Sequence, residues 1–405
     1  MRRTHGLLAA LLATALVFTA CGGDDEETSG DGGGDGAAAG SGPIVIGAAN
    51  GQTGFMSIFD IPSTNGQKLA VQDINEAGGV AGRKLELRVE DIKTDVNQIG
   101  PGTLKLLDDG AEVITTSCDY DFGGPAAREA QNQGKIGVGC AGAPLFGVQG
   151  IGPLAFNAYA ATPTEGAVMA QFAKSKDFGK AFLLQDTAIE YSKTVCDYFE
   201  QQWKAIGGEI AGKDTFQNDD PSVASQVTRL QGSDADFVAL CSYPPGGAAA
   251  VKQIRGAGID IPIVGAGGFD GTYWLEGIPK LSDFYNPAVG SLHGDDPNQE
   301  VNDFVARYTE EYGEAPSSAT YPLMGYTMIQ AIARALEETD GATDGEALKG
   351  ALEGFEDEEL IAGPSTYTAE CHIPLGRRMQ MIEIQNGKAA FLETVEPESV
   401  PESPC

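Results

Sequence analysis

Histidine and positive charge are both scarce in this 405-residue chain. Beyond residue 20 the histidines are His293 and His372, each isolated in sequence, so a histidine-based catalytic triad or metal cluster lacks its components. We expect both at the surface. Lysine and arginine total 26 against 58 aspartates and glutamates, which gives a net charge of −32. Such an acidic surface argues against nucleic acid or anionic lipid as a partner.

Common enzyme and cofactor motifs are also missing. No Cys-x-x-Cys spacing supports zinc or thioredoxin chemistry, and the chain has neither the P-loop lysine pattern nor Gly-x-Ser-x-Gly. Residues 137–142 fit Gly-x-Gly-x-x-Gly, but Pro144 follows at once and no helix start is evident, so we assign no dinucleotide site. Carboxylates are too numerous for counting to select or exclude a glycosidase pair. We predict no cofactor, no metal and no enzymatic activity.

Long apolar runs are limited to Leu7–Ala20, which follows Arg2 and Arg3. This run is too short to span a bilayer, which takes about 20 apolar residues. Its end resembles the cleavage signal of bacterial lipoproteins, with Cys21 acylated, although Phe18 stands where leucine is usual. We predict a signal peptide over residues 1–20 and a lipid anchor at Cys21, outside the cytoplasm on the cell membrane. The alternative is an ordinary secretory peptide, with Cys21 a bystander.

Residues 21–42 contain almost only Gly, Asp, Glu, Ala, Ser and Thr after the cysteine. Without an apolar side chain larger than alanine, this segment cannot bury enough surface to offset its ordering entropy. We expect a flexible acidic tether.

The rest of the chain predicts an α/β fold. Short apolar runs alternate with helical segments, which implies parallel strands with right-handed crossovers. In the first half we expect strands at Ile44–Ala48, Lys84–Glu90, Val113–Ser117 and Ile136–Gly139, and helices near Pro62–Ala77, Gln98–Asp108 and Pro125–Gln133. The pattern restarts after Thr162-Pro163, with strands at Ala181–Gln185, Gly208–Thr215, Phe237–Cys241 and Ile261–Val264, and helices near Thr164–Ala173, Tyr191–Ile206, Ser222–Gln231 and Ala248–Gly256.

Further elements complete two doubly wound lobes joined by a hinge of several crossings. We expect a strand at Ala288–Leu292, helices at Asn298–Tyr312 and Tyr321–Glu338, and a hairpin that turns at Asn386-Gly387. Lobe one would comprise residues 43–160 plus 293–363, lobe two residues 161–292 plus 364–395, and residues 396–405 a C-terminal tail. Loops after the strands would face a cleft between the lobes, because ligands bind at the carboxyl ends of such strands.

Seven cysteines occur, and assigning Cys21 to the lipid leaves six in an oxidising compartment. Six cysteines allow 15 pairings. The strand assignment favours three disulfides, each within one lobe: Cys118–Cys140, Cys196–Cys241 and Cys371–Cys405.

The segment Ile74–Leu87, INEAGGVAGRKLEL, resembles the branched-chain amino-acid-binding family of substrate-binding proteins, which have the type I periplasmic binding fold. In that family a helix ends in NxxGG and GxxLxL leads into the second strand. The opening Ile44–Gly47, the position of Tyr191 and the segment Tyr308–Pro316 add to the resemblance. It implies a monomer that closes around a small molecule and delivers it to the permease of an ATP-driven (ABC) importer.

The resemblance also implies where a ligand sits. Family members hold an amino acid by its carboxylate on lobe one, through a serine after the third strand and a threonine after the fourth. Here Asp119 takes the serine position and Gly142, after Cys140-Ala141, takes the threonine position. The acidic residue for the ammonium would fall at residues 265–268, where glycines including Gly267 stand, and Asp270 is the nearest carboxylate. The aromatic wall would comprise Tyr120, Tyr191, Tyr243 and Tyr321.

These departures favour a neutral or cationic ligand. Asp119 and Asp121 beside a bound carboxylate would repel it by about 4 kcal/mol per close pair at an effective dielectric near 20. Candidates are an amide, a urea-like compound, a polyol or an amine, besides an amino-acid-like solute. Alternatively, both aspartates point outward and cap the helix near Pro125. Two other functions remain open: a ligand-sensing module of a signalling receptor, and a hydrolase on the same fold.

Overall fold

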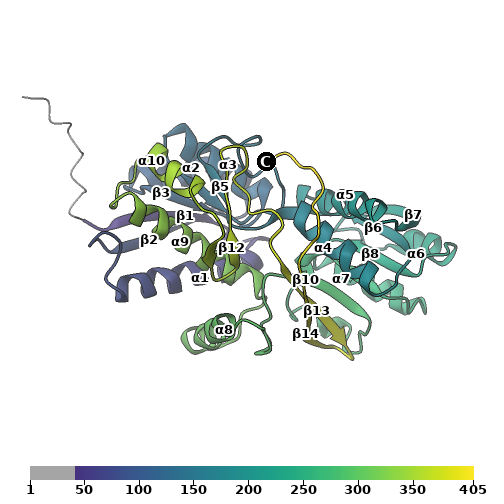
Figure 1. Cartoon of the computed structure of the whole chain (residues 1–405). Helices are drawn as coiled ribbons and strands as arrows, with labels where there is room; N and C mark the ends of the chain where they lie inside the picture. The colour runs from purple at the N-terminus through teal and green to yellow at the C-terminus, as the bar shows by residue number, and fades with distance from the viewer. Residues whose placement is uncertain (1–41) are drawn as a thin grey trace, which may run out of the picture. The chain divides into compact units, whose positions relative to one another are not determined.

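A computed structural model describes residues 42–405 of the chain (Figure 1). The predicted signal peptide, Cys21 and nearly all of the predicted tether lie outside these residues. No helix within residues 42–405 combines the length and the apolar character that a membrane span requires.

The first sheet has five parallel strands in the order β2-β1-β3-β4-β5. They are β1 (Ile44–Asn50), β2 (Leu85–Asp91), β3 (Val113–Thr116), β4 (Gly137–Gly139) and β5 (Ala155–Asn157). All seven residues of β1 are buried, as expected of a central strand that helices cover on both faces.

Six helices accompany this sheet: α1 (Ser57–Glu76), α2 (Val96–Asp108), α3 (Tyr120–Asn132), α8 (Gln299–Tyr312), α9 (Thr320–Glu338) and α10 (Gly345–Glu353). Helices α1 and α9 lie side by side (Figure 1). Two glycines allow this approach, because a Cβ on Gly66 would overlap the carbonyl of Pro322 and a Cβ on Gly325 that of Ser63. Their close packing fixes the start of α9, where several cleft residues lie.

The second sheet has seven strands in the order β14-β13-β10-β9-β8-β6-β7. They are β6 (Lys180–Asp186), β7 (Glu209–Phe216), β8 (Phe237–Cys241), β9 (Ile263–Gly265), β10 (Phe284–Ala288), β13 (Met379–Gln385) and β14 (Lys388–Val395). Strands β6 to β10 are parallel, and β13 and β14 add an antiparallel hairpin that turns at Asn386-Gly387 as predicted. The accompanying helices are α4 (Ala161–Ser175), α5 (Glu190–Ala205), α6 (Ala224–Gln231) and α7 (Gly246–Gly256).

The chain passes between the two sheet-based parts three times. The first crossing follows β5 and the second follows β10. The third lies between β13 and the short pair formed by β11 (Glu358–Leu360) and β12 (Gly363–Ser365). Arg377 joins two of these crossings, because its buried guanidinium donates to the carbonyls of Ala158 and Pro364 and to Ser365 Oγ. Burial lowers the pKa of Arg377 to about 10. These bonds make Arg377 a fixed point of the hinge.

The predicted disulfides are confirmed: Cys118–Cys140, Cys196–Cys241 and Cys371–Cys405. The predicted fold class is also confirmed. The last disulfide holds the C-terminus beside the loop after β4, where Cys405 O accepts from the backbone N–H of Gln149. The residues before this disulfide contact the part of the chain built on the second sheet. There Gln171 on α4 donates to Glu396 O and accepts from the backbone N–H of Glu398.

Some expectations were wrong. The strand expected at Ala288–Leu292 ends at Ala288, because the buried Phe284 packs on Phe269 and Trp274 and sets an earlier strand, β10. Helix α3 begins at Tyr120, five residues before Pro125, because Asp119 caps it. The pattern also missed β5, β11, β12 and α10, which are short.

His372, expected at the surface, is fully buried. Its ring stacks on Phe156 with centroids 3.7 Å apart, and its nitrogens contact Ala155 O and Glu353 Oε1, each at 3.0 Å. Burial lowers its pKa, so this histidine is a neutral core residue. His293 is partly buried.

Candidate ligand-binding cleft

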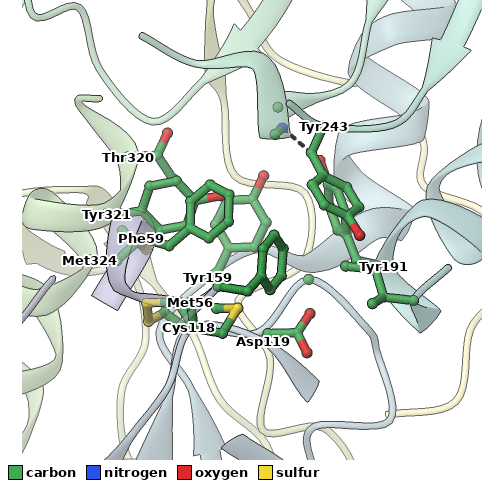
Figure 2. A pocket seen from close by; sticks show the side chains of 16 residues that line it. Met56, Phe59, Cys118, Asp119, Tyr159, Tyr191, Tyr243, Thr320, Tyr321 and Met324 are labelled. Carbon is green, nitrogen blue, oxygen red and sulfur yellow. Dashed lines mark hydrogen bonds between the residues drawn. A yellow bond between two sulfur atoms is a disulfide. The ribbon is translucent and has the colours of Figure 1, made fainter. Parts of the chain in front are cut away.

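A cavity lies between the two sheets, where strands from both end (Figure 2). Its volume is about 40 Å³. One water molecule needs about 10–15 Å³ of cavity volume measured in this way, so the cavity has room for only a few waters. An amino-acid-sized ligand therefore requires the walls to move apart. The residues that line it are Phe55, Met56, Phe59, Cys118, Asp119, Cys140, Gly142, Tyr159, Ile189, Tyr191, Tyr243, Gly267, Gly268, Thr320, Tyr321 and Met324.

Most of these residues follow strand ends directly. Asp119 follows β3, Gly142 follows β4, Tyr191 follows β6, Tyr243 follows β8 and Gly267 follows β9. The carboxyl ends of parallel strands share one edge of a sheet, so the loops after them meet there. The structure therefore brings together seven of the predicted site residues; besides these five, Cys140 and Tyr321 line the cavity.

Asp119 both lines the cavity and caps a helix. Its Oδ1 accepts from the backbone N–H of Asp121 at 2.9 Å, which starts α3. The residue is 5% exposed. Burial first, and then the charge of Asp121, raises the pKa of the Asp119 carboxyl to about 7. The two predicted positions for Asp119, cleft and cap, are thus compatible.

Glu165, which the sequence analysis did not single out, is a buried anchor for two cavity tyrosines. Its Oε2 accepts from Tyr159 OH at 2.7 Å. Its Oε1 accepts from Tyr191 OH at 2.7 Å and from the backbone N–H of Gly267 at 2.8 Å. Burial raises the pKa of Glu165, and these three hydrogen bonds lower it. Because Tyr159 follows β5 and Tyr191 follows β6, Glu165 couples the two sides of the cleft.

Gly142 leaves room for the ring of Tyr191. A Cβ at Gly142 would overlap that ring, so no larger residue fits here without displacing Tyr191. The Tyr191 oxygen in turn accepts from the backbone N–H of Gly268 at 2.8 Å. The glycine at the position where the family resemblance implies threonine is therefore explained by the tyrosine that packs on it.

Aromatic rings form the mouth and one wall of the cavity (Figure 2). The Phe59 and Tyr321 centroids are 4.9 Å apart, and those of Phe55 and Tyr243 are 5.7 Å apart. Three residues of this wall were not among the predicted site residues: Phe55, Met56 and Phe59. The signal for them is a group of apolar residues just after the loop that follows β1.

Four predicted site residues do not line the cavity. Tyr120 OH accepts from the Arg128 guanidinium, and Ala141 O accepts from Asn157 Nδ2. Asp121 Oδ2 accepts from the backbone N–H of Glu190 at 3.3 Å, across the cleft. Asp270 Oδ2 accepts from the backbone N–H of Thr320 at 2.7 Å and so holds the start of α9.

Asp270 thus supports Tyr321 from behind the cavity wall. Burial raises the pKa of Asp270 to about 6.

Within residues 42–405, no group of three or more histidine, cysteine, aspartate and glutamate side chains is arranged to hold a metal ion.

Two parallel-sheet lobes with a cavity between their carboxyl edges define a type I solute-binding protein. The sequence profile described as periplasmic binding protein matches residues 43–389, so the chain belongs to that family, whose members act outside the cytoplasm.

Several solved structures share the fold. The substrate-binding protein LivJ of Streptococcus pneumoniae, solved with isoleucine, is 24% identical with a TM-score of 0.77, over 88% of this chain and 100% of that one. The leucine-binding protein LivK of Thermotoga maritima is 20% identical with a TM-score of 0.77, over 88% and 99%. A curated relative, the Leu/Ile/Val-binding protein BraC3 of Rhizobium johnstonii, is 21% identical over 80% of this chain and 87% of its own length.

Proposed function

We propose that this protein captures a small polar solute in the cleft by hinge closure and delivers it, chemically unchanged, to an ABC permease. Lobe one comprises residues 43–160 plus 293–363, and lobe two residues 161–292 plus 364–395. The protein acts as a monomer, held to the outer face of the membrane through Cys21. The relatives named above, which are binding proteins of branched-chain amino acid transport, support this proposal.

The contacts across the cleft carry the proposal. Tyr191 of lobe two packs on Gly142 of lobe one, and Phe55 of lobe one meets Tyr243 of lobe two. The α5 N-terminus has no cap from its own residue Ile189, and Asp121 of lobe one reaches it instead. These contacts are non-covalent, so a ligand that fills the cavity can shift the balance between open and closed forms.

The lining favours binding over catalysis. Its two cysteines, Cys118 and Cys140, are joined to each other, which leaves no free thiol among them. Its carboxyl group, Asp119, faces tyrosines and apolar side chains and has no lysine, arginine or histidine beside it in the lining. This arrangement lacks the nucleophile–base pair of a covalent hydrolase.

A ligand screen on the mature chain tests the proposal. Thermal-shift measurements over amino acids, amides, ureas, amines and polyols should give one class a rise in Tm, and calorimetry should give one site per chain. Small-angle scattering should show a smaller radius of gyration with ligand, and mass spectrometry should recover the ligand unchanged. Turnover of the ligand, or binding without compaction, would contradict capture by closure.

A further inference from the structure

Asp119 contributes the one carboxyl group in the lining of the cleft. Its donors are backbone N–H groups at the start of its own helix, at Asp121 and Phe122. Its second oxygen, Oδ2, accepts no hydrogen bond from any other element of the described chain, although the residue is 95% buried. Figure 2 shows this carboxyl group among the side chains that line the cavity. A carboxyl group in the lining that pairs with no cation can accept a hydrogen bond from a donor on the ligand.

Aromatic rings surround that carboxyl group. Phe59, Tyr159, Tyr191, Tyr243 and Tyr321 all line the same cavity. The hydroxyls of Tyr159 and Tyr191 are already bound to Glu165, so these residues offer the ligand mainly their rings. The faces of tyrosine and phenylalanine rings attract organic cations, most strongly where water is excluded.

An anionic group finds no cationic side chain here. Among the described residues that line the cavity, none is a lysine, arginine or histidine. The two lobe-one positions at which the family resemblance implies hydroxyls carry Asp119 and Gly142. A ligand carboxylate beside Asp119 would be repelled whenever Asp119 is ionised. With Asp119 ionised, the cavity therefore discriminates against both acids and zwitterionic amino acids.

We propose that the solute is a small organic ammonium ion without a carboxylate, whose N–H donates to Asp119 and whose carbon skeleton packs among the aromatic rings. This proposal rests on the proposed function, since it names the ligand class of the same cleft.

The charged surroundings of Asp119 give the proposal a second measurable consequence. Asp60 faces it from α1, Asp121 from α3, Tyr243 from the loop after β8 and Tyr321 from α9. Burial, and then the charges of Asp121 and Asp60, raise the pKa of Asp119 to about 7, and none of these groups is a cation that would lower it. An ammonium ion favours the ionised carboxylate and lowers that pKa. Binding at pH 7 should therefore release roughly half a proton per ligand.

Matched probes test the ligand class on the mature chain. Each set keeps one skeleton and changes the charge: 3-methylbutylamine, 3-methylbutan-1-ol, 3-methylbutanoate and leucine, and the corresponding set built on 2-phenylethylamine. Calorimetry at pH 7 in two buffers of different ionisation enthalpy measures affinity and proton release together. An amine should bind at least about tenfold more tightly than the matching alcohol (about 1.4 kcal/mol), with proton release, and the acids should not bind.

An Asp119→Asn variant should fold, because asparagine also caps helices, but should lose at least tenfold in amine affinity and lose the proton release. The matched control is Asp95→Asn, which changes the cap of α2 outside the cavity and should bind amines like the wild type. Unchanged amine binding by Asp119→Asn overturns the proposal. Tightest binding of leucine, an acid or an alcohol also overturns it, while capture by the cleft stands. If no compound binds here or in the wider screen, the proposed function fails as well.

Discussion

The ring of Phe55 lies 5.7 Å, centroid to centroid, from the ring of Tyr243, and this pair joins the two lobes at the mouth of the cleft. Phe55 comes just before α1 of lobe one, and Tyr243 follows β8 of lobe two. Phe55 is 39% exposed and is one of few large apolar side chains at the surface. In the proposed closure, this pair would act as a latch on the closed form.

Truncation of this latch should speed ligand release. Phe55→Ala removes the contact between the lobes, so we expect ligand dissociation about tenfold faster with little change in association or in Tm. Stopped-flow measurement of dissociation checks it. Val96→Ala, which truncates an exposed apolar residue on α2, is the control and should match the wild type. An unchanged dissociation rate in Phe55→Ala would show that the pair does not hold the cleft shut.

A single methyl group at Gly142 should hinder closure. Gly142→Ala places a Cβ inside the ring of Tyr191, so the lobes cannot reach the described arrangement without displacing that ring. We expect an affinity loss of more than tenfold and a larger radius of gyration by scattering in the presence of ligand. Gly256→Ala, where a Cβ meets nothing, should leave both unchanged. Wild-type affinity in Gly142→Ala would mean that Tyr191 is free to move.

Removal of the Glu165 carboxyl group should destabilise the protein. Glu165→Ala leaves two buried tyrosine hydroxyls and the Gly267 N–H without their acceptor, at about 1–3 kcal/mol for each donor that finds no new partner. We expect a loss of at least 2 kcal/mol in the free energy of unfolding, measured with urea. Glu165→Gln retains an oxygen for Tyr191 and Gly267 and should lose less. Equal losses of unfolding free energy in both variants would show that the charge of Glu165, and not its hydrogen bonds, stabilises the protein.

Stability should fall as the pH rises from about 4 to about 7. Burial raises the pKa of Asp60 to about 6 and that of Asp119 to about 7, against about 3.9 in an unfolded chain. In this range the folded state holds more protons than the unfolded state, so these groups stabilise the fold at low pH and that contribution is lost as they ionise. In Asp119→Asn, the free energy of unfolding should fall by a few kcal/mol less between about pH 4 and pH 7 than it does in the wild type. A slope equal to that of the wild type would show that Asp119 does not titrate there.

Much of the cleft could be predicted from the sequence because a local rule governs it. Apolar runs mark the parallel strands, and residues that follow them must gather at one edge of each sheet. Asp119, Gly142, Tyr191 and Tyr243 follow strand ends and line the cavity for this reason. The disulfide Cys118–Cys140 was predictable in the same way, since its cysteines follow the neighbouring strands β3 and β4.

The remaining features depended on tertiary packing. Glu165 and Met324 lie on helices, and which face of a helix meets the cavity is set by the elements packed around it, not by local pattern. The same holds for Asp270, which follows a strand yet turns away to hold the start of α9. Sequence alone determined the family, most of the long parallel strands and the sheet edge where the predicted site residues gather. Packing alone decided the roles of Glu165 and Asp270, because the groups that donate to these carboxylates lie far from them in the chain.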